Sequence, residues 1–589
     1  MKIKTLVSLS VVAVALAACG GGDINVDAQN NASFVEDNSV GDGATVITGG
    51  STTEEFECAS YIDESGDTQT GQIEGENCIY GTEFVNFDNP ILTNLTLTDI
   101  GDGAHIFTGS LYMGENYDNL ADATTAGITQ GGDGPTLNVR AGATIALSNP
   151  NSAIAINRGA QIVALGRADA PITFTSESDI LGTISSPEAV QEWGGMVIAG
   201  FGFINSCDYE AGWDRTDNDP ALTLVGGQEC SLSTEGLEGG REVHYGGTVP
   251  TDSSGQLSYV VVKHAGFEVS TGNELNGITF GAVGSSTILE NLQIYSNKDD
   301  GVEFFGGGAN LTNYVAMYVR DDSIDIDQGY YGTISNALVI QGGGLGNDFK
   351  TGNHCVESDG SGSGLKAQNI ANGYTSRATI NNLTCILSAK HGDADDQPAS
   401  AGINMEEGHE LTVNDSIVTT AYGDATTDAD GNTVADFAFD NYCFQMEDTE
   451  DLENAGNGFI NINTTIFACN VISSNKNTDS DVTLVAGTTY GAISGQAFLE
   501  AQDNVTYAAA NDGSESPDGS ATLNILDTFY SVPVEDLVVN GVTALDLFDA
   551  GTTVNASTTV GAVTRANDWT TGWVYGLVDG NRGQALWFE

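Results

Sequence analysis

The chain repeats itself every 22 or 23 residues from about residue 257 onward. The clearest copies are 289–294, 311–316 and 334–339, each with an asparagine at its third position. The next copy lies 46 residues on, which is twice 23, and later steps of 32 and 49 residues indicate coils that carry loops. The shared asparagines are Asn291, Asn313, Asn336, Asn382, Asn414 and Asn463.

A second strand-like segment lies between these copies. Residues 276–280, 300–304 and 322–326 align, and 402–405 is a partial copy. Each alternates polar and apolar residues, as a half-buried strand does. A repeating unit of about 22 residues that is rich in β-branched residues is better suited to two or three short strands than to helices. We predict an all-β fold, a right-handed single-stranded parallel β-helix, with coils about 4.8 Å apart and the shared asparagines bonded from coil to coil.

The two ends of such a solenoid need cover, because they otherwise expose strand edges and the apolar core. We expect an N-terminal cap at residues 53–134, the parallel β-helix at 135–474 and a C-terminal β-rich region or cap at 475–589. An aromatic cluster near the C-terminus is a candidate cover for that end, and alternatively a binding surface. Its members are Trp569, Trp573, Tyr575, Trp587 and Phe588.

Several motifs between residues 137 and 330 carry a family resemblance. They include Gly142-Ala-Thr-Ile145, Pro171-Ile-Thr-Phe-Thr-Ser176 and Trp193-Gly-Gly-Met-Val-Ile198, and the acidic segments 299–306 and 321–330. With these motifs the chain resembles bacterial surface β-helix proteins of the pectate-lyase-like superfamily, over about residues 135–470. The resemblance implies the fold and an exported or lipid-anchored protein, and it implies no particular activity.

The N-terminus has the pattern of an export signal. Two lysines within residues 1–4 precede an apolar run, 5–18, that is too short to span a membrane. The run ends Leu16-Ala-Ala-Cys19, which resembles the lipobox of bacterial lipoproteins. The resemblance implies a signal peptide at 1–18, lipidation of Cys19 and a flexible tether over 19–52. An ordinary secretory signal that contains Cys19 is the alternative.

Glycine rather than aspartate follows Cys19, which by analogy with enterobacterial sorting favours the outer membrane. We therefore expect a protein that is lipid-anchored in the cell outer membrane, with a periplasmic or surface-exposed body. The chain carries 81 acidic and 17 basic residues, a formal net charge of −64. That charge excludes nucleic acid as a partner, because nucleic-acid binding requires basic patches. Binding to other polyanions would require a bridging cation.

The chain has nine cysteines, and eight of them remain available for disulfides if Cys19 carries lipid. The eight form neighbouring pairs separated by 20, 23, 30 and 26 residues, each about one coil. An exported compartment permits disulfides, and eight cysteines allow 105 connectivities. We predict the sequential set, Cys58–Cys78, Cys207–Cys230, Cys355–Cys385 and Cys443–Cys469. A metal site is the weaker alternative, because no Cys-x-x-Cys motif is present.

Acidic residues recur at the period of one coil. Three pairs of acids are each 22 residues apart, which places their members one above the other. Stacked carboxylates repel unless they are protonated or neutralised, and Ca²⁺ favours cages of oxygen ligands. We predict a calcium site, with a solvated acidic face as the alternative. The candidate ligands are Asp299, Asp300, Glu303, Asp321, Asp322, Asp325 and Asp327.

A Ca²⁺-dependent polysaccharide lyase would also need a basic residue to abstract a proton. Lys298, Arg320 and Lys350 lie on coils near the acids and are weak candidates, since ion pairs explain them equally well. The histidines His354, His391 and His409 lie among acids in expected loops, and structural or solvated roles suit them better than zinc binding. Whether the chain is an enzyme stays uncertain at this stage, and we expect that it is not.

The sequence favours a lipid-anchored envelope β-helix protein that acts as a non-catalytic binding or adhesion module, for a glycan or for a partner outer-membrane protein. One alternative is a Ca²⁺-dependent polysaccharide lyase or another carbohydrate-active enzyme. The other is a structural component of the envelope or surface layer.

Overall fold

A computed structural model of the chain divides into two compact units, Met1–Glu55 and Phe56–Glu589. The description below concerns the second unit. The expected signal peptide and tether lie outside the described residues, as do Cys19, Lys350, His391, Trp587 and Phe588. The described residues are 56–213, 222–234, 237, 242–270, 273–342, 352–361, 365–388, 401–421, 426–427, 433–434, 442–469, 471–473, 482–484, 488–490, 498–499, 505–507, 526, 528–539, 542–547, 555, 557–577 and 586.

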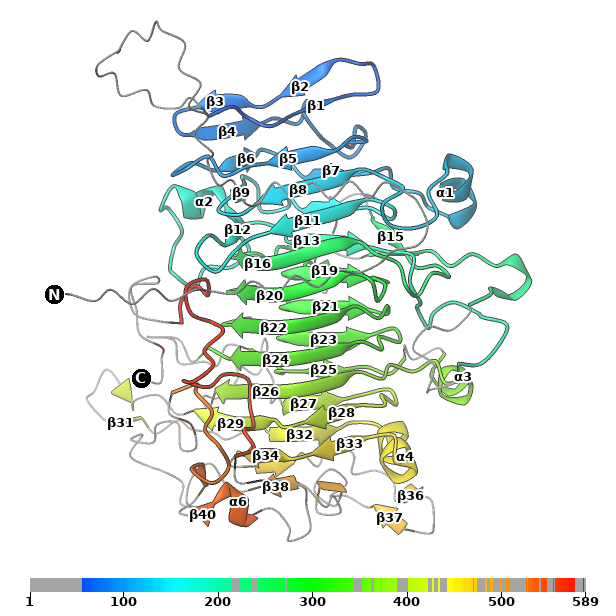
Figure 1. Cartoon of the computed structure of the whole chain (residues 1–589). Helices are drawn as coiled ribbons and strands as arrows, with labels where there is room; N and C mark the ends of the chain where they lie inside the picture. Colours follow the sequence, from blue (N-terminus) through cyan, green and yellow to red (C-terminus); the bar gives the residue numbers. More distant parts are fainter. Residues whose placement is uncertain are drawn as a thin grey trace, which may run out of the picture. The chain divides into compact units, whose positions relative to one another are not determined.

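Short strands stack in chain order into a parallel sheet of one strand per coil (Figure 1). We call this the first sheet. An isolated parallel bridge between Val356 and Ile403 leads from it to three further parallel strands, β27 (Ala401–Met405), β32 (Tyr442–Met446) and β35 (Val471–Ser473). The strands of the first sheet are β7 (Leu111–Met113), β10 (Ile154–Ile156), β13 (Met196–Ala199), β19 (Ile278–Gly281), β21 (Val302–Phe305), β23 (Ile324–Asp327) and β25 (Glu357–Ser358).

A second, longer sheet runs beside the first (Figure 1). Its central strands bend in the middle, so each supplies two sides of a coil. Its strands are β3 (Gln72–Glu74), β4 (Asn77–Tyr80), β5 (Leu95–Leu97), β6 (His105–Phe107), β8 (Thr136–Arg140), β9 (Thr144–Leu147), β11 (Gln161–Leu165), β12 (Ile172–Ser176), β16 (Gly255–Lys263), β20 (Ile288–Tyr295), β22 (Asn310–Met317), β24 (Thr333–Ile340), β26 (Thr379–Ser388), β28 (Thr412–Asn414), β29 (Ile417–Ala421), β33 (Asn461–Asn463), β34 (Thr465–Ala468) and β38 (Val505–Tyr507). The predicted parallel β-helix is thereby confirmed.

The remaining elements are short and lie outside the two long sheets. The helices are α1 (Leu120–Ala126), α2 (Glu177–Ile180), η1 (Val225–Gly227), α3 (Lys366–Asn372), α4 (Thr449–Asn457) and α6 (Ala544–Leu547). Within the described residues, no helix is long and apolar enough to cross a membrane. The small hairpins pair β1 (Ser60–Ile62) with β2 (Thr68–Thr70), β14 (Leu232–Ser233) with β15 (His244–Tyr245), β17 (Glu268–Ser270) with β18 (Asn273–Glu274), β30 (Thr426–Thr427) with β31 (Thr433–Val434), β36 (Val482–Leu484) with β37 (Thr488–Tyr490), and β39 (Val538–Val539) with β40 (Val542–Thr543).

The bend in the long strands occurs at the repeated asparagine. Asn291, Asn313 and Asn336 have φ values of 55°, 60° and 58°, a left-handed conformation that asparagine tolerates better than most residues. The Nδ2 of Asn313 donates to Oδ1 of Asn291 over 2.9 Å, and the Nδ2 of Asn336 donates to Oδ1 of Asn313 over 2.9 Å. The predicted coil-to-coil stack of amides is therefore present in these coils.

Further along the chain the predicted stack is wrong by one residue. Asn381, not Asn382, bonds to Asn414, and Asn414 bonds to Asn463, each over 2.9 Å. The reason is that Asp415 and Thr464 take the left-handed position there, so the preceding asparagines align with Asn381. The amides form two separate stacks instead of one.

Apolar side chains fill the coils in vertical rows. Phe280 and Phe304 occupy paired positions on neighbouring strands, and their rings stack with centroids 4.9 Å apart. Tyr330 stacks on Phe304 at 4.4 Å and donates its hydroxyl hydrogen to the carbonyl of Ala309. Burial of each such side chain contributes about 2 kcal/mol. The core is therefore a continuous column inside the solenoid.

The N-terminal end is antiparallel only at its tip. Strands β1 to β3 form antiparallel pairs, whereas β4 pairs in parallel with β6, and β7 with β10. Parallel coils thus begin at Asn77–Tyr80, inside the range 53–134 that the sequence assigns to a cap. The disulfide Cys58–Cys78 ties the first described residues to β4.

The described residues near the C-terminus pack against a flank of the solenoid. Described residues between 528 and 577, here called the C-terminal strap, run along the second sheet (red and orange in Figure 1). The side-chain amide of Gln293 pairs with both the N–H and the carbonyl of Tyr575, each over 2.7 Å. Trp573 is 3% exposed and packs edge-on against Tyr259. The described members of the predicted aromatic cluster are therefore part of a lateral apolar interface.

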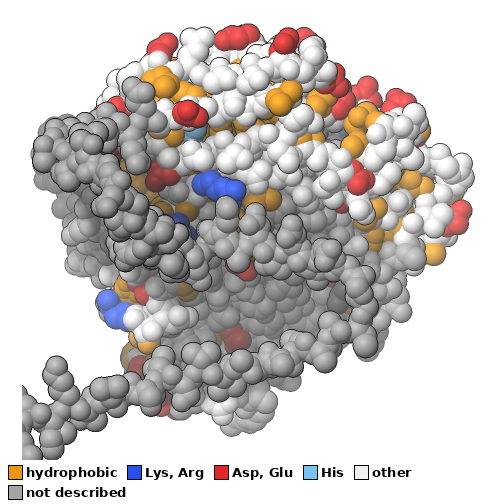
Figure 2. All heavy atoms as spheres, turned by 45° about the horizontal axis from the view of Figure 1, so that its top comes forward, with side chains coloured by type: hydrophobic (Ala, Val, Ile, Leu, Met, Phe, Trp, Pro, Cys, Tyr) orange, Lys and Arg blue, Asp and Glu red, His pale blue; other side chains and the backbone are white. Residues whose placement is uncertain are grey.

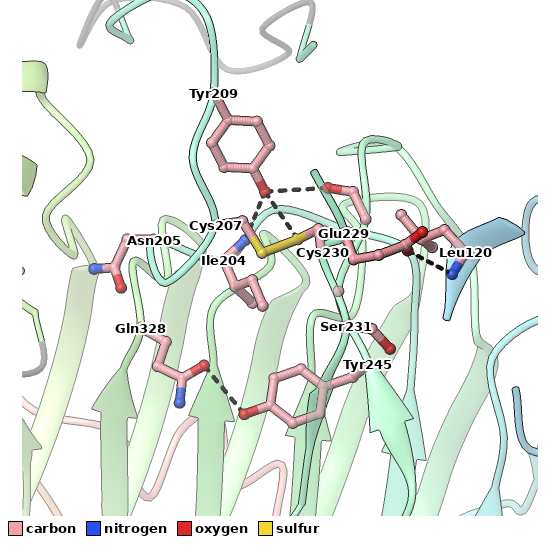
Figure 3. Close-up of a disulfide and its surroundings, with 12 residues drawn as sticks. Leu120, Ile204, Asn205, Cys207, Tyr209, Glu229, Cys230, Ser231, Tyr245 and Gln328 are labelled. Atoms are coloured by element: carbon pink, nitrogen blue, oxygen red, sulfur yellow. Dashed lines mark hydrogen bonds between the residues drawn. A yellow bond between two sulfur atoms is a disulfide. The ribbon is translucent and has the colours of Figure 1, made fainter. Parts of the chain in front are cut away.

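A long insertion after β13 lies over the turns that follow the first sheet. It contains the disulfide Cys207–Cys230 (Figure 3). The hydroxyl of Tyr209 donates to the carbonyl of Gly247, and Tyr245 donates to Gln328 Oε1 of the coil below over 3.1 Å. The insertion is thus fastened to the coils at several points.

Candidate functional site

Two rows of acids run across the outward-facing positions of the first sheet. In the first acid column, Glu303 pairs with Asp325, and Asp325 pairs with Glu357 on the next coil. Two positions further along the same strands, Asp327, Asp359 and Glu406 form the second acid column, and Asp359 bridges directly to Glu406. The parallel register places the three acids of each column on three successive coils, about 4.8 Å apart.

A third row lies at the turn that precedes these strands. Asn276, Asp300, Asp322 and His354 occupy equivalent places on successive coils, and all are nearly buried. Each side-chain oxygen accepts the backbone N–H of the next member: Asn276 from Asp300 over 3.2 Å, Asp300 from Asp322 over 2.9 Å, and Asp322 from His354 over 2.5 Å. Backbone hydrogen bonds therefore hold these carboxylates beside the first acid column.

The rows converge into clusters whose ligand atoms lie within 4.8 Å of one another. Each cluster offers three side chains of a type that binds divalent cations. In one of them, Nδ1 of His354 is 2.9 Å from Oδ1 of Asp322 and 3.4 Å from Oε1 of Glu357. The four clusters are Glu274–Asp299–Asp321, Asp300–Glu303–Asp325, Asp300–Asp321–Asp322 and Asp322–His354–Glu357.

Burial and mutual repulsion strongly raise the pKa values of several of these carboxyl groups. Burial raises the pKa of Asp300, Asp322 and Asp325 well above its ordinary value, and neighbouring acids raise it further. Burial, followed by the charge of Asp325, raises the pKa of Asp359 to about 11. Without a counter-ion, the ionised form of these carboxyl groups is therefore disfavoured. A bound cation would remove the same repulsion by a different route.

The structure brings most of the predicted ligands together. Six of the seven belong to the four clusters, and Asp327 lies in the second acid column instead. Glu274, His354 and Glu357 were missed. Glu274 precedes the aligned strand segments, and the 22-residue spacing does not reach His354 and Glu357, because their coil carries an insertion. Of the two roles expected for His354, structural or solvated, the structure excludes the solvated one, since the side chain is 5% exposed and its Nδ1 lies 2.9 Å from Oδ1 of Asp322.

The two basic candidates for lyase chemistry that the structure describes, Lys298 and Arg320, already contact protein groups. Nζ of Lys298 lies 3.3 Å from Oε1 of Glu274, beside the cluster with Asp299 and Asp321. Arg320 donates to the carbonyl of Glu188 over 3.4 Å, and burial lowers its pKa. His409 is fully buried, accepts the N–H of Ala378 at Nε2 and contacts Ser358 at Nδ1, which makes it a structural residue.

All eight described cysteines form disulfides. The pairs are Cys58–Cys78, Cys207–Cys230, Cys355–Cys385 and Cys443–Cys469, the sequential set. Each joins segments that the coil period brings close. The disulfides therefore fasten neighbouring coils and insertions, and they leave none of these thiols free for chemistry.

Fold and site together define a class of protein, a single-stranded parallel β-helix with carboxylates stacked along one sheet. The family model described as a pectate-lyase like beta helix domain matches residues 120–496. The chain therefore belongs to the family of pectate-lyase-like β-helix proteins.

The chain is also similar to a solved structure, that of the Dettilon tailspike protein, at 10% identity and a TM-score of 0.15. The match covers 74% of this chain and 62% of the tailspike chain, less than two thirds of its length. The search of curated proteins gave no match.

Proposed function

We propose that this chain is a lipid-anchored binding module of the cell envelope, whose acid clusters along the first acid column hold Ca²⁺ and present it to a glycan or to a partner envelope protein. The observation that carries the proposal is the register of the columns. Carboxylates on successive coils stand in line on an outward face, where a divalent cation would satisfy several of them at once.

A bound calcium ion would also provide a contact for a ligand. A cation held by Asp300, Glu303 and Asp325 would still have open coordination positions, because Ca²⁺ takes six to eight oxygen ligands. Carboxylate or hydroxyl oxygens of an acidic glycan fit those positions. The strongly negative chain would otherwise repel such a ligand.

A Ca²⁺-dependent lyase is the second candidate. The observation that favours it is the position of Lys298 beside the Glu274–Asp299–Asp321 cluster. For proton abstraction the amine would have to leave Glu274 and lose its proton. A screen of acidic polysaccharides for release of unsaturated oligosaccharides, with K298A as the comparison, separates this activity from binding alone.

Calcium titration of the mature chain tests the binding role. We expect the melting temperature to rise, with a stabilisation of about 2.7 kcal/mol when free Ca²⁺ is 100 times its Kd. The double variant D325N/E357Q should lose this response, whereas E290Q, an exposed acid on the second sheet, should keep it. An unchanged melting temperature at millimolar Ca²⁺ would contradict the calcium site. A glycan array with and without EDTA then identifies the ligand class.

The membrane anchor is tested separately. Mass spectrometry of the mature N-terminus should show an acylated Cys19. Cleavage elsewhere, with Cys19 unmodified, would refute the anchor while leaving the binding role open.

A further inference from the structure

The cluster of Asp322, His354 and Glu357 differs from the other three clusters because it contains an imidazole. Asp322 and His354 are 2% and 5% exposed, and Glu357 is partly buried. Acids at the surface are arranged differently. Figure 2 looks toward the N-terminal end and shows them spread among uncharged side chains along the rim of the described surface. Burial and mutual contact therefore set the cluster apart from the acidic surface.

The backbone of His354 is bonded to the preceding coil through both of its polar groups. Its N–H donates to Oδ1 of Asp322 over 2.5 Å, and its carbonyl accepts the N–H of Ser323 over 3.0 Å. The next residue, Cys355, forms a disulfide with Cys385 of β26. These contacts hold the imidazole beside Asp322 in the protein alone, which is the preorganisation that a metal site requires.

The distances within the cluster fit a small divalent ion. Nδ1 of His354 lies 2.9 Å from Oδ1 of Asp322 and 3.4 Å from Oε1 of Glu357. Zinc binds nitrogen and carboxylate oxygen at about 2.0–2.2 Å, so neighbouring ligands lie about 3.0 Å apart in an octahedral site and about 3.4 Å apart in a tetrahedral one. One ion of this size can therefore reach all three ligand atoms with little movement of the side chains.

A second, independent feature is a buried amide oxygen beside the cluster. Asn404 lies next to Glu357 on the following coil and is 0% exposed. Its Nδ2 donates to Oε1 of Glu357 over 3.3 Å and to Oε1 of Glu406 over 2.8 Å, whereas its Oδ1 has no hydrogen-bond partner among the described residues. A buried acceptor without a donor is costly. A half-turn of the amide exchanges the two atoms and brings the oxygen to the cluster, at the separation of neighbouring ligands of one ion.

We propose that Asp322, His354 and Glu357 bind a divalent transition-metal ion, with the amide oxygen of Asn404 as a fourth ligand. Imidazole nitrogen suits Zn²⁺ and related ions, whereas Ca²⁺ takes oxygen ligands. The clusters that contain only carboxylates remain suited to Ca²⁺. The inference rests on the proposed binding of cations by the acid clusters, and it assigns this cluster a metal of a different class. The ion would join three successive coils.

Titration of the mature chain with Zn²⁺, in a buffer that contains millimolar Ca²⁺, tests the assignment. We expect Zn²⁺ to bind and to raise the melting temperature despite the excess of Ca²⁺. H354N should weaken the tightest Zn²⁺ binding by about tenfold or more, because asparagine keeps an oxygen near Asp322 but lacks the imidazole. N404A should weaken it to a smaller extent, since the amide oxygen carries no formal charge. H244N, which removes a partly buried histidine near Asp118, should leave it unchanged.

X-ray absorption at the zinc edge gives a readout that depends on no variant. We expect one imidazole together with oxygen ligands around the zinc, and a shell without imidazole would overturn the inference. Unchanged Zn²⁺ affinity in H354N would also overturn it, because His354 would then only pair with the carboxylates. Stabilisation by Ca²⁺ without specific Zn²⁺ binding refutes this inference alone. Zn²⁺ binding that depends on His354, without any response to Ca²⁺, refutes the calcium role alone.

Discussion

Asn313 shows how one residue serves both the bend and the stacking of the coils. Its backbone adopts φ 60°, which turns the strand from one side of the coil to the next. Its amide links Asn291 on the preceding coil to Asn336 on the following coil. Asparagine suits the position because it tolerates the left-handed conformation and offers both a donor and an acceptor. The sequence revealed this residue through its spacing.

We expect N313G to lower the free energy of unfolding by about 1–2 kcal/mol, because two coil-to-coil hydrogen bonds disappear. Glycine adopts the left-handed backbone conformation of this position without strain. N313A should lose about 1 kcal/mol more, since alanine is strained at this φ. Urea unfolding of both variants measures the difference, and T312A on the same strand is the control. Equal stability of N313A and N313G would show that the backbone conformation costs nothing here.

At the scale of the element, the long strands are unusual in being buried on both faces after the bend. In β20, β22 and β24 the last four residues are all buried. Continuous apolar runs such as Tyr314-Val-Ala-Met317 are typical of strands covered on both sides. One face packs in the solenoid core, and the other is covered by the C-terminal strap. The runs indicate that another segment covers them, but that segment, the C-terminal strap, lies more than 180 residues further along the chain.

We expect Q293A to loosen the strap. The substitution leaves the N–H and the carbonyl of Tyr575 without their partner, which costs about 2 kcal/mol if neither finds water. Limited proteolysis should then cut the strap faster than in the wild type, while E290A on the exposed part of β20 should not change the rate. Unchanged cleavage in Q293A would mean that apolar contacts alone hold the strap.

At the scale of the whole molecule, stability is distributed along a solenoid. Each coil contacts mainly its neighbours, so the ends open more easily than the centre. The Cys58–Cys78 disulfide stabilises the N-terminal end, where antiparallel strands replace parallel ones. The strap crosses several coils and joins them laterally.

We expect the double variant C58S/C78S to lower the free energy of local opening at the N-terminal end by about 3 kcal/mol. This is the stabilisation expected of a disulfide that closes a loop of this size. Hydrogen exchange should accelerate around β1 to β4 and stay unchanged in β20 to β24. Faster exchange throughout the solenoid would show instead that the whole chain unfolds as one cooperative unit.

The sequence by itself determined the repeat, the parallel β-helix and most of the residues in the acid clusters, because a fixed coil length converts spacing along the chain into stacking in space. Insertions break that rule. Only the tertiary structure placed His354 and Glu357 beside Asp322, moved the second asparagine stack by one residue and set the C-terminal strap against the flank. These contacts join segments whose separation is not a whole number of coils, so packing decided them.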